Sequence, residues 1–273
     1  MKNKQNIFDL SGKVAVVTGV KGLLGPIWTK ALLGAGARVA GIDLKDSKPS
    51  RDFKAVQRGC NARVFKIYDA DILVKGNLEK AFANIKKDFG VPTILVNNAG
   101  IDQPPSPSKK EYYFEEIPFD VGRKILDVNV LGSFLMIQVF GSEMTKLKKS
   151  SIINIASHYG LVSPDPHFYN HIKNDPPFIK PPMYGPSKAA LIQLTKYMSV
   201  LWGKYNVRVN CISPGGVTNN QDPRFVKKYT TRVPLGRMAV KEDLAGPLVF
   251  LASDASSYLT GTNIVVDGGF TAL

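Results

Sequence analysis

A tyrosine and a lysine four positions apart are the residues of this sequence best suited to acid–base chemistry. Tyr184 and Lys188 stand in the segment YGPSK, at the start of a stretch that is predicted to be helical over 187–205. Side chains at positions i and i+4 share one face of a helix, so the phenol and the ammonium can converge on one site. A free phenol has a pKa of about 10, and a neighbouring ammonium favours the phenolate. The pair is a candidate proton donor and acceptor, although this spacing alone also arises by chance.

A glycine-rich turn near the N-terminus could bind the phosphates of a nucleotide. The apolar run 14–19 leads into TGVKGLLG, and a helix is expected immediately afterwards, over 25–36. Glycines let the backbone approach a pyrophosphate, whose charge is stabilised by free amides at a helix N-terminus. Asp43 closes the next apolar run, where a carboxylate would bind an adenosine ribose and repel a 2′-phosphate. We therefore expect NAD rather than NADP, although Lys45 lies nearby and Asp43 would also suit an ordinary turn.

Short runs rich in β-branched residues alternate with longer amphipathic stretches along the chain. The runs are almost continuously apolar, which is typical of parallel strands covered by helices on both faces. We therefore predict a doubly wound α/β sheet in a single domain over 1–273. The expected strands are 14–19, 38–44, 63–70, 93–100, 151–157, 207–215 and 263–269, and the expected helices are 25–36, 77–90, 122–147 and 187–205.

Composition narrows the class of protein. Of the 273 residues 44% are hydrophobic, and 36 Lys and Arg against 22 Asp and Glu give a formal net charge of +14. Because the basic residues are scattered, we expect a solvated basic surface that attracts a phosphorylated or carboxylated ligand, and no nucleic acid partner. No apolar run has the length of a membrane span, so no membrane association is expected. Two cysteines, Cys60 and Cys211, cannot form a disulfide framework and suit the reducing cytoplasm.

Several further motifs, in order along the chain, resemble the single-domain type of the short-chain dehydrogenase/reductase family over nearly the whole sequence. The resemblance implies a Rossmann-like, mostly parallel seven-stranded sheet with helices on both faces. It also implies a homodimer or homotetramer with the Tyr184 helix at the subunit interface. The motifs are NNAG at 97–100, Asn129, SIINIAS ending at Ser157, SPGG at 213–216 and VDGG at 266–269.

The resemblance also implies roles for individual residues. Tyr184 would be the general acid/base, and Lys188 would lower its pKa and hold the nicotinamide ribose. Ser157 would bind the reacting oxygen, Asn129 would anchor a water in a proton relay, and no catalytic metal is expected. Substrate contacts would come from Ser157, His158, Tyr159 and Tyr184. The cofactor would be held by Gly19, Gly22, Leu24, Gly25, Asp43, Asp71, Ile72, Asn98, Ala99, Gly100, Tyr184, Lys188, Pro214, Gly215 and Val217.

The glycine turn departs from the commonest family pattern, T-G-x-x-x-G-x-G. Leu23 stands where the middle glycine would fall, and Gly22 stands one place earlier. The resulting spacing is better known from the extended, sugar-nucleotide branch of the family. It puts the phosphate-binding geometry of the turn in question more than the family itself.

The interval between Ser157 and Tyr184 is the second departure, because it is longer than in most members. The extra residues, at about 158–183, interleave aromatic side chains with polar ones and hold all three histidines. Such a segment suits a polyhydroxylated ligand, although a surface loop or an oligomer contact is an equally good interpretation. His167 and His171 have a spacing that could suit a metal, but the surrounding prolines argue against a helix there.

We therefore expect an NAD(H)-dependent oxidoreductase that interconverts a secondary alcohol and a ketone on a sugar, sugar acid or polyol. The long interval more loosely resembles bacterial dehydrogenases of surface-sugar (nonulosonate-type) biosynthesis. One alternative is a 3-oxoacyl-type or other ketone reductase, against which the polar insertion argues. Another is a non-catalytic dinucleotide-binding sensor or scaffold, which would not need Ser157, Tyr184 and Lys188 together.

Overall fold

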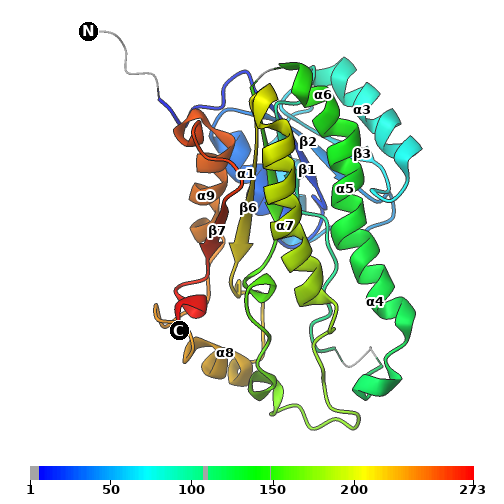
Figure 1. Cartoon of the computed structure of the whole chain (residues 1–273), viewed down its shortest axis with the longest axis vertical. Coiled ribbons are helices and arrows are strands. Elements are labelled where there is room, and N and C mark those ends of the chain that lie inside the picture. The colour runs from blue at the N-terminus through cyan, green and yellow to red at the C-terminus, as the bar shows by residue number, and fades with distance from the viewer. Residues whose placement is uncertain (1–5, 107–109, 148) are drawn as a thin grey trace.

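Seven parallel strands form one sheet at the centre of the molecule (Figure 1). The structure, a computed structural model, describes residues 6–106, 110–147 and 149–273; the rest of the predicted domain lies outside the described residues. The strand order β3-β2-β1-β4-β5-β6-β7 confirms the predicted doubly wound α/β class. The strands are β1 (Val14–Thr18), β2 (Arg38–Asp43), β3 (Phe65–Asp69), β4 (Ile94–Asn97), β5 (Ser150–Ile155), β6 (Val207–Pro214) and β7 (Asn263–Val266).

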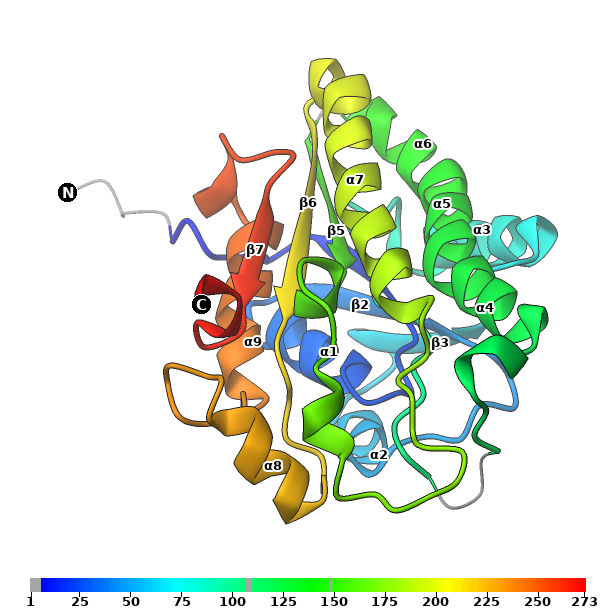
Figure 2. The same cartoon turned by 60° about the horizontal axis from the view of Figure 1, so that its bottom comes forward.

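Helices cover both faces of the sheet, which explains why the strands are apolar throughout rather than in alternation. Every residue of β1, β4 and β5 is buried. One face packs against α1 (Gly25–Gly34), α2 (Arg51–Gly59) and α9 (Glu242–Ala252). The other packs against α3 (Lys75–Phe89), the long helix over 119–147 and α7 (Tyr184–Trp202) (Figure 2). The two apolar cores lie between these helices and the sheet.

The long helix is built from short α-helical pieces joined by π-helical turns. Its pieces are α4 (Phe119–Leu126), α5 (Ser133–Met136) and α6 (Ser142–Met144), with π-helical turns at Asp127–Gly132 and Ile137–Gly141. By length and composition alone, it is the one helix of the described residues that could cross a membrane. Half of its most apolar stretch is buried, and its inner residues belong to the core formed with α3, α7 and the sheet. Packing within the fold accounts for its apolar character.

Three helices lie where the periodicity of the sequence predicts none: α2, α8 (Pro223–Thr230) and α9. In α2 only Phe53 and Val56 are buried, so its apolar stripe is too narrow to stand out. Pro247 lies inside α9, where a proline normally argues against a helix.

The insertion at 158–183 packs at the end of the sheet toward which β6 points, beside α8 and the start of α7 (Figures 1 and 2). It contains two short 3-10 turns, His158–Gly160 and Pro166–Tyr169. Its aromatic rings do not line an open surface. Instead Phe168, Tyr169 and Phe178 are buried in a small core that includes Tyr229 of α8 and Phe270. These rings therefore stabilise the insertion itself.

Candidate active site

The residues that the sequence singles out gather at the carboxyl ends of the strands. Gly19 follows β1, Asn98 follows β4, Ser157 lies just beyond β5, and Gly215 follows β6. The strand order reverses between β1 and β4, and open parallel sheets bind ligands in the crevice at such a point. The topology therefore brings together residues that are far apart in the chain.

The glycine turn is packed too closely to accept side chains at two of its glycines. Gly19 has a φ of +65°, and a Cβ there would lie 2.8 Å from the Cα of Ala99. A Cβ on Gly25 would lie 2.4 Å from the carbonyl oxygen of Gly19. α1 begins at Gly25 with Leu24 as its N-cap and no capping side chain, which suits an anion. Leu23 is 38% exposed, so it does not fill the turn.

Hydrogen bonds fasten the turn after β4 to the glycine turn. The hydroxyl oxygen of Thr18 accepts from the amides of Asn98 and Ala99, at 3.0 and 2.9 Å. The side-chain amide of Asn98 donates to the carbonyls of Thr18 and Gly19, at 2.9 and 3.2 Å, and its oxygen accepts from Trp28 at 2.7 Å. Asn98 therefore holds the two turns in register, and its side chain already has protein partners.

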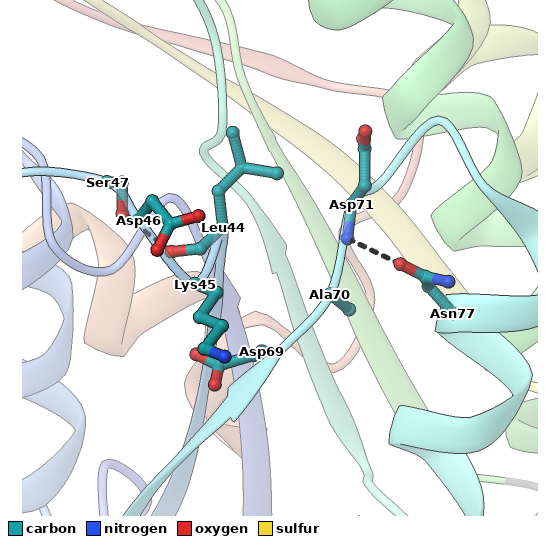
Figure 3. A pocket seen from close by; sticks show the side chains of 8 residues that line it. All are labelled: Leu44, Lys45, Asp46, Ser47, Asp69, Ala70, Asp71 and Asn77. Atoms are coloured by element: carbon teal, nitrogen blue, oxygen red, sulfur yellow. Dashed lines mark hydrogen bonds between the residues drawn. The ribbon is translucent and has the colours of Figure 1, made fainter.

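A cavity of about 460 Å³ lies beside the ends of β2 and β3, where the adenosine half of a dinucleotide would be expected. Asp71 is among its lining residues (Figure 3), and its carboxylate accepts from the amide of Leu73 at 2.9 Å. Ile72 lies elsewhere: its side chain is buried against Gly132, so only its backbone could face a cofactor. The lining residues are Leu44, Lys45, Asp46, Ser47, Asp69, Ala70, Asp71 and Asn77.

Asp43 and Lys21 meet at the edge of this cavity. One oxygen of Asp43 accepts from the amide of Lys21 at 2.7 Å, and the other accepts from the amide of Leu44 and the hydroxyl of Ser47. The ammonium of Lys21 donates to the carbonyls of Leu44 and Lys45, at 2.6 and 3.1 Å. The sequence reasoning missed Lys21, whose only signal is its position directly before Gly22. The ammonium also lies 3.9 Å from Asp69, so a mostly covered cation stands at this end of β2 and β3, while Asp43 is contacted by the backbone amide of Lys21 rather than by its charge.

Ser157, Tyr184 and Lys188 converge as their motifs predict. Ser157 is the N-cap of the turn after β5, and its hydroxyl is close enough to Tyr184 to lower the pKa of the phenol. Tyr184 is the first residue of α7, and Lys188 lies one helical turn further on. The ammonium of Lys188 donates to the carbonyl of Ile155 at 2.9 Å and lies 5.8 Å from the ring centroid of Tyr184. Ser157 and Lys188 are buried, whereas Tyr184 is partly exposed.

Burial controls the acidity of these groups. Burial and then the charge of Asp102 raise the pKa of Tyr184, while the nearby side chain of Ser157 lowers it. Burial also lowers the pKa of Lys188 to about 8. The net direction for Tyr184 is opposite to the one expected from Lys188, because loss of solvent around the phenol is the largest influence on its pKa.

Asn129 lies in a π-helical turn of the long helix and is fully buried. Its side-chain oxygen accepts from the amide of Ile101 at 2.7 Å, and its nitrogen donates to the carbonyl of Ile101 and to Ser187, at 3.1 and 3.0 Å. It thus fixes the chain that leaves β4; its role in a water relay stays a prediction. A Cβ on Gly100 would lie 3.2 Å from this oxygen and 3.4 Å from the Lys188 nitrogen. A side chain at this position would therefore press against Asn129 and Lys188.

His158 and Tyr159, expected to contact substrate, are both largely buried. The Nδ1 of His158 lies 3.0 Å from the carbonyl of Pro214, to which it can donate, and Nε2 lies 3.4 Å from the hydroxyl of Tyr229. Burial lowers the pKa of His158 to about 4, so the ring is neutral near neutral pH. Its hydrogen bond with the carbonyl of Pro214 holds the end of β6 in place. Burial raises the pKa of both Tyr159 and its neighbour Tyr169.

Asp102 and Lys180 are a charged pair that the sequence reasoning missed. The ammonium of Lys180 donates to both carboxylate oxygens of Asp102, at 2.7 and 2.6 Å, and lies 5.0 Å from the ring centroid of Tyr184. The two residues are 78 positions apart, so no local spacing could have revealed them. Within the described residues, no group of three or more His, Cys, Asp or Glu side chains could hold a metal ion.

Comparisons with known proteins identify the family and the fold of the chain. The family model described as short chain dehydrogenase matches residues 13–228. An NAD-dependent glycerol dehydrogenase of Listeria innocua is 32% identical over 97% of this chain and 96% of its own length. A sorbose reductase of Candida albicans is 34% identical, over 98% and 90%. A short chain dehydrogenase of Leptospira borgpetersenii, solved with bound NAD+, superposes with a TM-score of 0.83 at 32% identity and covers 98% of this chain and 96% of its own.

Proposed function

The chain belongs to the short-chain dehydrogenase family, and on this premise we propose that it interconverts a secondary alcohol and a ketone on a sugar, sugar acid or polyol, using NAD(H). The observation that carries the proposal is the convergence of Ser157, Tyr184 and Lys188 beside the glycine turn. Two of the similar proteins are named for glycerol and for sorbose, both polyhydroxylated compounds. That likeness supports a substrate with several hydroxyl groups.

The residues of the crevice fit a nicotinamide dinucleotide. The glycine turn would bind the pyrophosphate, the cavity lined by Asp71 would bind the adenosine, and Lys188, next to Gly100, would bind the nicotinamide ribose. We propose NAD over NADP because the carboxylate of Asp43 is hydrogen-bonded to Ser47, which lines this cavity, and a carboxylate at this place would repel a 2′-phosphate. Lys21 would attract a 2′-phosphate less strongly than Asp43 would repel it, since two carbonyls already bind the Lys21 ammonium. When bound, the nicotinamide ring would take the hydride from the alcohol carbon or return it.

The protein's own groups would handle the proton. In alcohol oxidation, Ser157 donates a hydrogen bond to the reacting oxygen and Tyr184, as the phenolate, takes the hydroxyl proton. Lys188 favours that phenolate, and Asn129 would pass the proton onward through water. Because burial raises the pKa of Tyr184, the phenolate is scarce near neutral pH. Alcohol oxidation should therefore accelerate as the pH rises, whereas ketone reduction uses the protonated form.

We place the enzyme in the cytoplasm, as a homo-oligomer without a nucleic acid partner. Cys60 and Cys211 are free thiols, which suits a reducing compartment. Burial raises the pKa of Cys211 to about 12, so this thiol is inert in the core.

The test is turnover with each cofactor. Purified protein is given NAD+ or NADP+ with glycerol, threitol, arabinitol, glucitol and the corresponding sugar acids, and reduced nicotinamide is followed by fluorescence. We expect at least one polyhydroxylated alcohol to reduce NAD+, and NADP+ to react at least about tenfold more slowly, which corresponds to about 1.4 kcal/mol. Asp43→Asn should narrow the difference, and Asp46→Asn in the same cavity should not.

Other outcomes would separate the alternatives. Activity on apolar ketones alone would favour a 3-oxoacyl-type or other ketone reductase. Tight NADH binding without turnover of any alcohol or ketone would favour a sensor or scaffold. Faster reaction with NADP+ would show that Lys21 or Lys45, rather than Asp43, sets the cofactor preference.

A further inference from the structure

An ion pair stands at the substrate end of the crevice. Asp102 follows the turn after β4, and Lys180 lies near the end of the insertion. The side chain of Lys180 is 8% exposed and that of Asp102 is 36% exposed, so the carboxylate faces outward while the ammonium is covered. The amide of Gln103 also donates to Asp102, at 2.8 Å. Asn129 holds the adjacent backbone at Ile101, which fixes the position of the carboxylate.

This pair lies next to the group that would carry the proton. The ammonium of Lys180 is 5.0 Å from the ring centroid of Tyr184 and 5.8 Å from that of Tyr159. After burial, the charge of Asp102 is among the causes that raise the pKa of both phenols and of Tyr169. Asp102 is therefore linked through the Lys180 ammonium to the ring of Tyr184, which would contact the reacting oxygen of a substrate.

The charges of the pair decide what it can recognise. Two of the three protons of the Lys180 ammonium point to Asp102, so this cation is already neutralised. A carboxylate has about four acceptor positions. The Lys180 ammonium occupies two of those on Asp102 and the amide of Gln103 occupies a third. Asp102 can thus accept a hydrogen bond from a hydroxyl, but it would repel a substrate carboxylate at the same place.

We propose that Asp102 and Lys180 are specificity-determining residues that select uncharged polyols and sugars over sugar acids. The inference rests on the proposed function, because it concerns which alcohol reaches Tyr184. Asp102 accepts from a hydroxyl beyond the reacting carbon, and it keeps the Lys180 ammonium from binding a carboxylate. Lys180 in turn holds Asp102 in place and reduces the cost of keeping a charge at the edge of a buried site.

The test compares matched substrates in the wild type and in charge variants. The probes are threitol with threonate, arabinitol with arabinonate, and glucitol with gluconate, each pair of one stereochemical series. The readout is the ratio of kcat/KM for the acid to that for the polyol, in which any shared change in the acidity of Tyr184 cancels. We expect the wild-type ratio to be about tenfold or more below unity, and to rise with added salt, which screens the repulsion.

Variants should move the ratio in opposite directions. Asp102→Asn frees the Lys180 ammonium to bind a substrate carboxylate, so the ratio should rise by about tenfold or more. Lys180→Gln leaves the Asp102 carboxylate without its cation, so repulsion of the acids grows and the ratio should fall. Lys173→Gln, on an exposed lysine of the same insertion, should leave it unchanged. NADH binding and circular dichroism identify variants that fold, and the wild-type ratio and its salt dependence test the inference even if one variant does not fold.

The outcomes distinguish this inference from the proposed function. Preference of the wild type for the acids, or an unchanged ratio in folded Asp102→Asn, would overturn the inference while the enzyme still oxidises alcohols. Selective loss of acid turnover in Lys180→Gln from an acid-preferring wild type would assign Lys180 to carboxylate binding instead. No turnover of any probe, with NADH bound, would overturn the proposed function and this inference with it.

Discussion

His158 follows directly after Ser157, and its imidazole is 3% exposed between the end of β6 and Tyr229. Burial lowers its pKa to about 4, so the folded protein resists charging this ring. An unfolded histidine titrates near pH about 6.5 and takes up its proton first as the pH falls. The stability that the neutral ring contributes is therefore present above about pH 6.5 and lost as the pH falls toward about 4.

Replacing His158 should make the protein less sensitive to acid. Between about pH 7 and about pH 5, proton uptake by His158 in the unfolded chain should lower the wild-type free energy of unfolding by about 2 kcal/mol. His158→Asn has no such group and should not show this loss. Asparagine is chosen because its side-chain amide can still donate to Pro214. Urea unfolding at the two pH values measures the difference, with exposed His167→Asn as the control. An equal loss in wild type and His158→Asn would contradict a buried neutral ring.

Sequence patterns located the residues that act within short motifs and missed those that act in pairs across the fold. Tyr184 and Lys188 share a helix face, so their spacing already implies proximity. Asp102 and Lys180 meet only because the insertion folds back over the turn after β4. The aromatic residues of the insertion suggested a ligand-binding segment from the sequence. In the structure these rings pack against one another, because apolar rings in a long loop must also be buried.

The element that positions the cofactor is the junction between β1 and α1. A methyl group on Gly25 would meet backbone atoms of the glycine turn, at 2.4 Å from the Gly19 carbonyl oxygen and 2.6 Å from the Cα of Val20. Backbone cannot rotate away as a side chain can. Gly34, at the other end of α1, has nothing within 4 Å of such a methyl group. The same substitution at the two ends therefore separates packing from helix propensity.

Gly25→Ala should weaken NADH binding by about tenfold or more, because α1 must move away from the turn. Gly34→Ala should leave binding unchanged and raise the free energy of unfolding by about 0.5–1 kcal/mol, the usual gain in a helix. Fluorescence titration gives the dissociation constants, and chemical unfolding gives the stabilities. Equal NADH affinity in Gly25→Ala and the wild type would show that this junction does not shape the cofactor site.

At the scale of elements, all seven strands were predictable because buried parallel strands leave continuous apolar runs. The helices were less predictable. α8 has a single buried residue, Tyr229, and α9 carries Gly246 and Pro247 within an apolar run, so neither shows a helical period. Tertiary packing against the sheet and the insertion, rather than local pattern, makes these segments helical.

The whole molecule presents an apolar face formed by α7 and the long helix. Phe119 and Val200 are 84% and 85% exposed, and Tyr197 and Leu131 are also exposed. A groove of about 760 Å³ runs between α4 and the start of α7. Extended apolar faces of this kind mark sites of association. Since α7 begins with Tyr184, association here would also hold that residue in place.

A charge on this face should shift the oligomeric state. Val200→Glu should reduce the mass in solution, because a carboxylate would be buried without a partner at the interface. Gln57→Glu, an equal change of charge on the exposed face of α2, should leave the mass unchanged. Size-exclusion chromatography with light scattering measures both. An identical mass distribution for Val200→Glu and the wild type would place the subunit contact elsewhere.

The most direct test of the account is polyol-dependent reduction of NAD+ by the wild type and by Tyr184→Phe, with NADH binding measured on the same preparations. Phenylalanine keeps the ring and removes the group that takes the proton. The account predicts turnover by the wild type, a loss of about a thousandfold in the variant, and the same NADH affinity in both. Retained turnover in Tyr184→Phe would contradict the mechanism, and so would a wild type that binds NADH but oxidises no polyol or sugar.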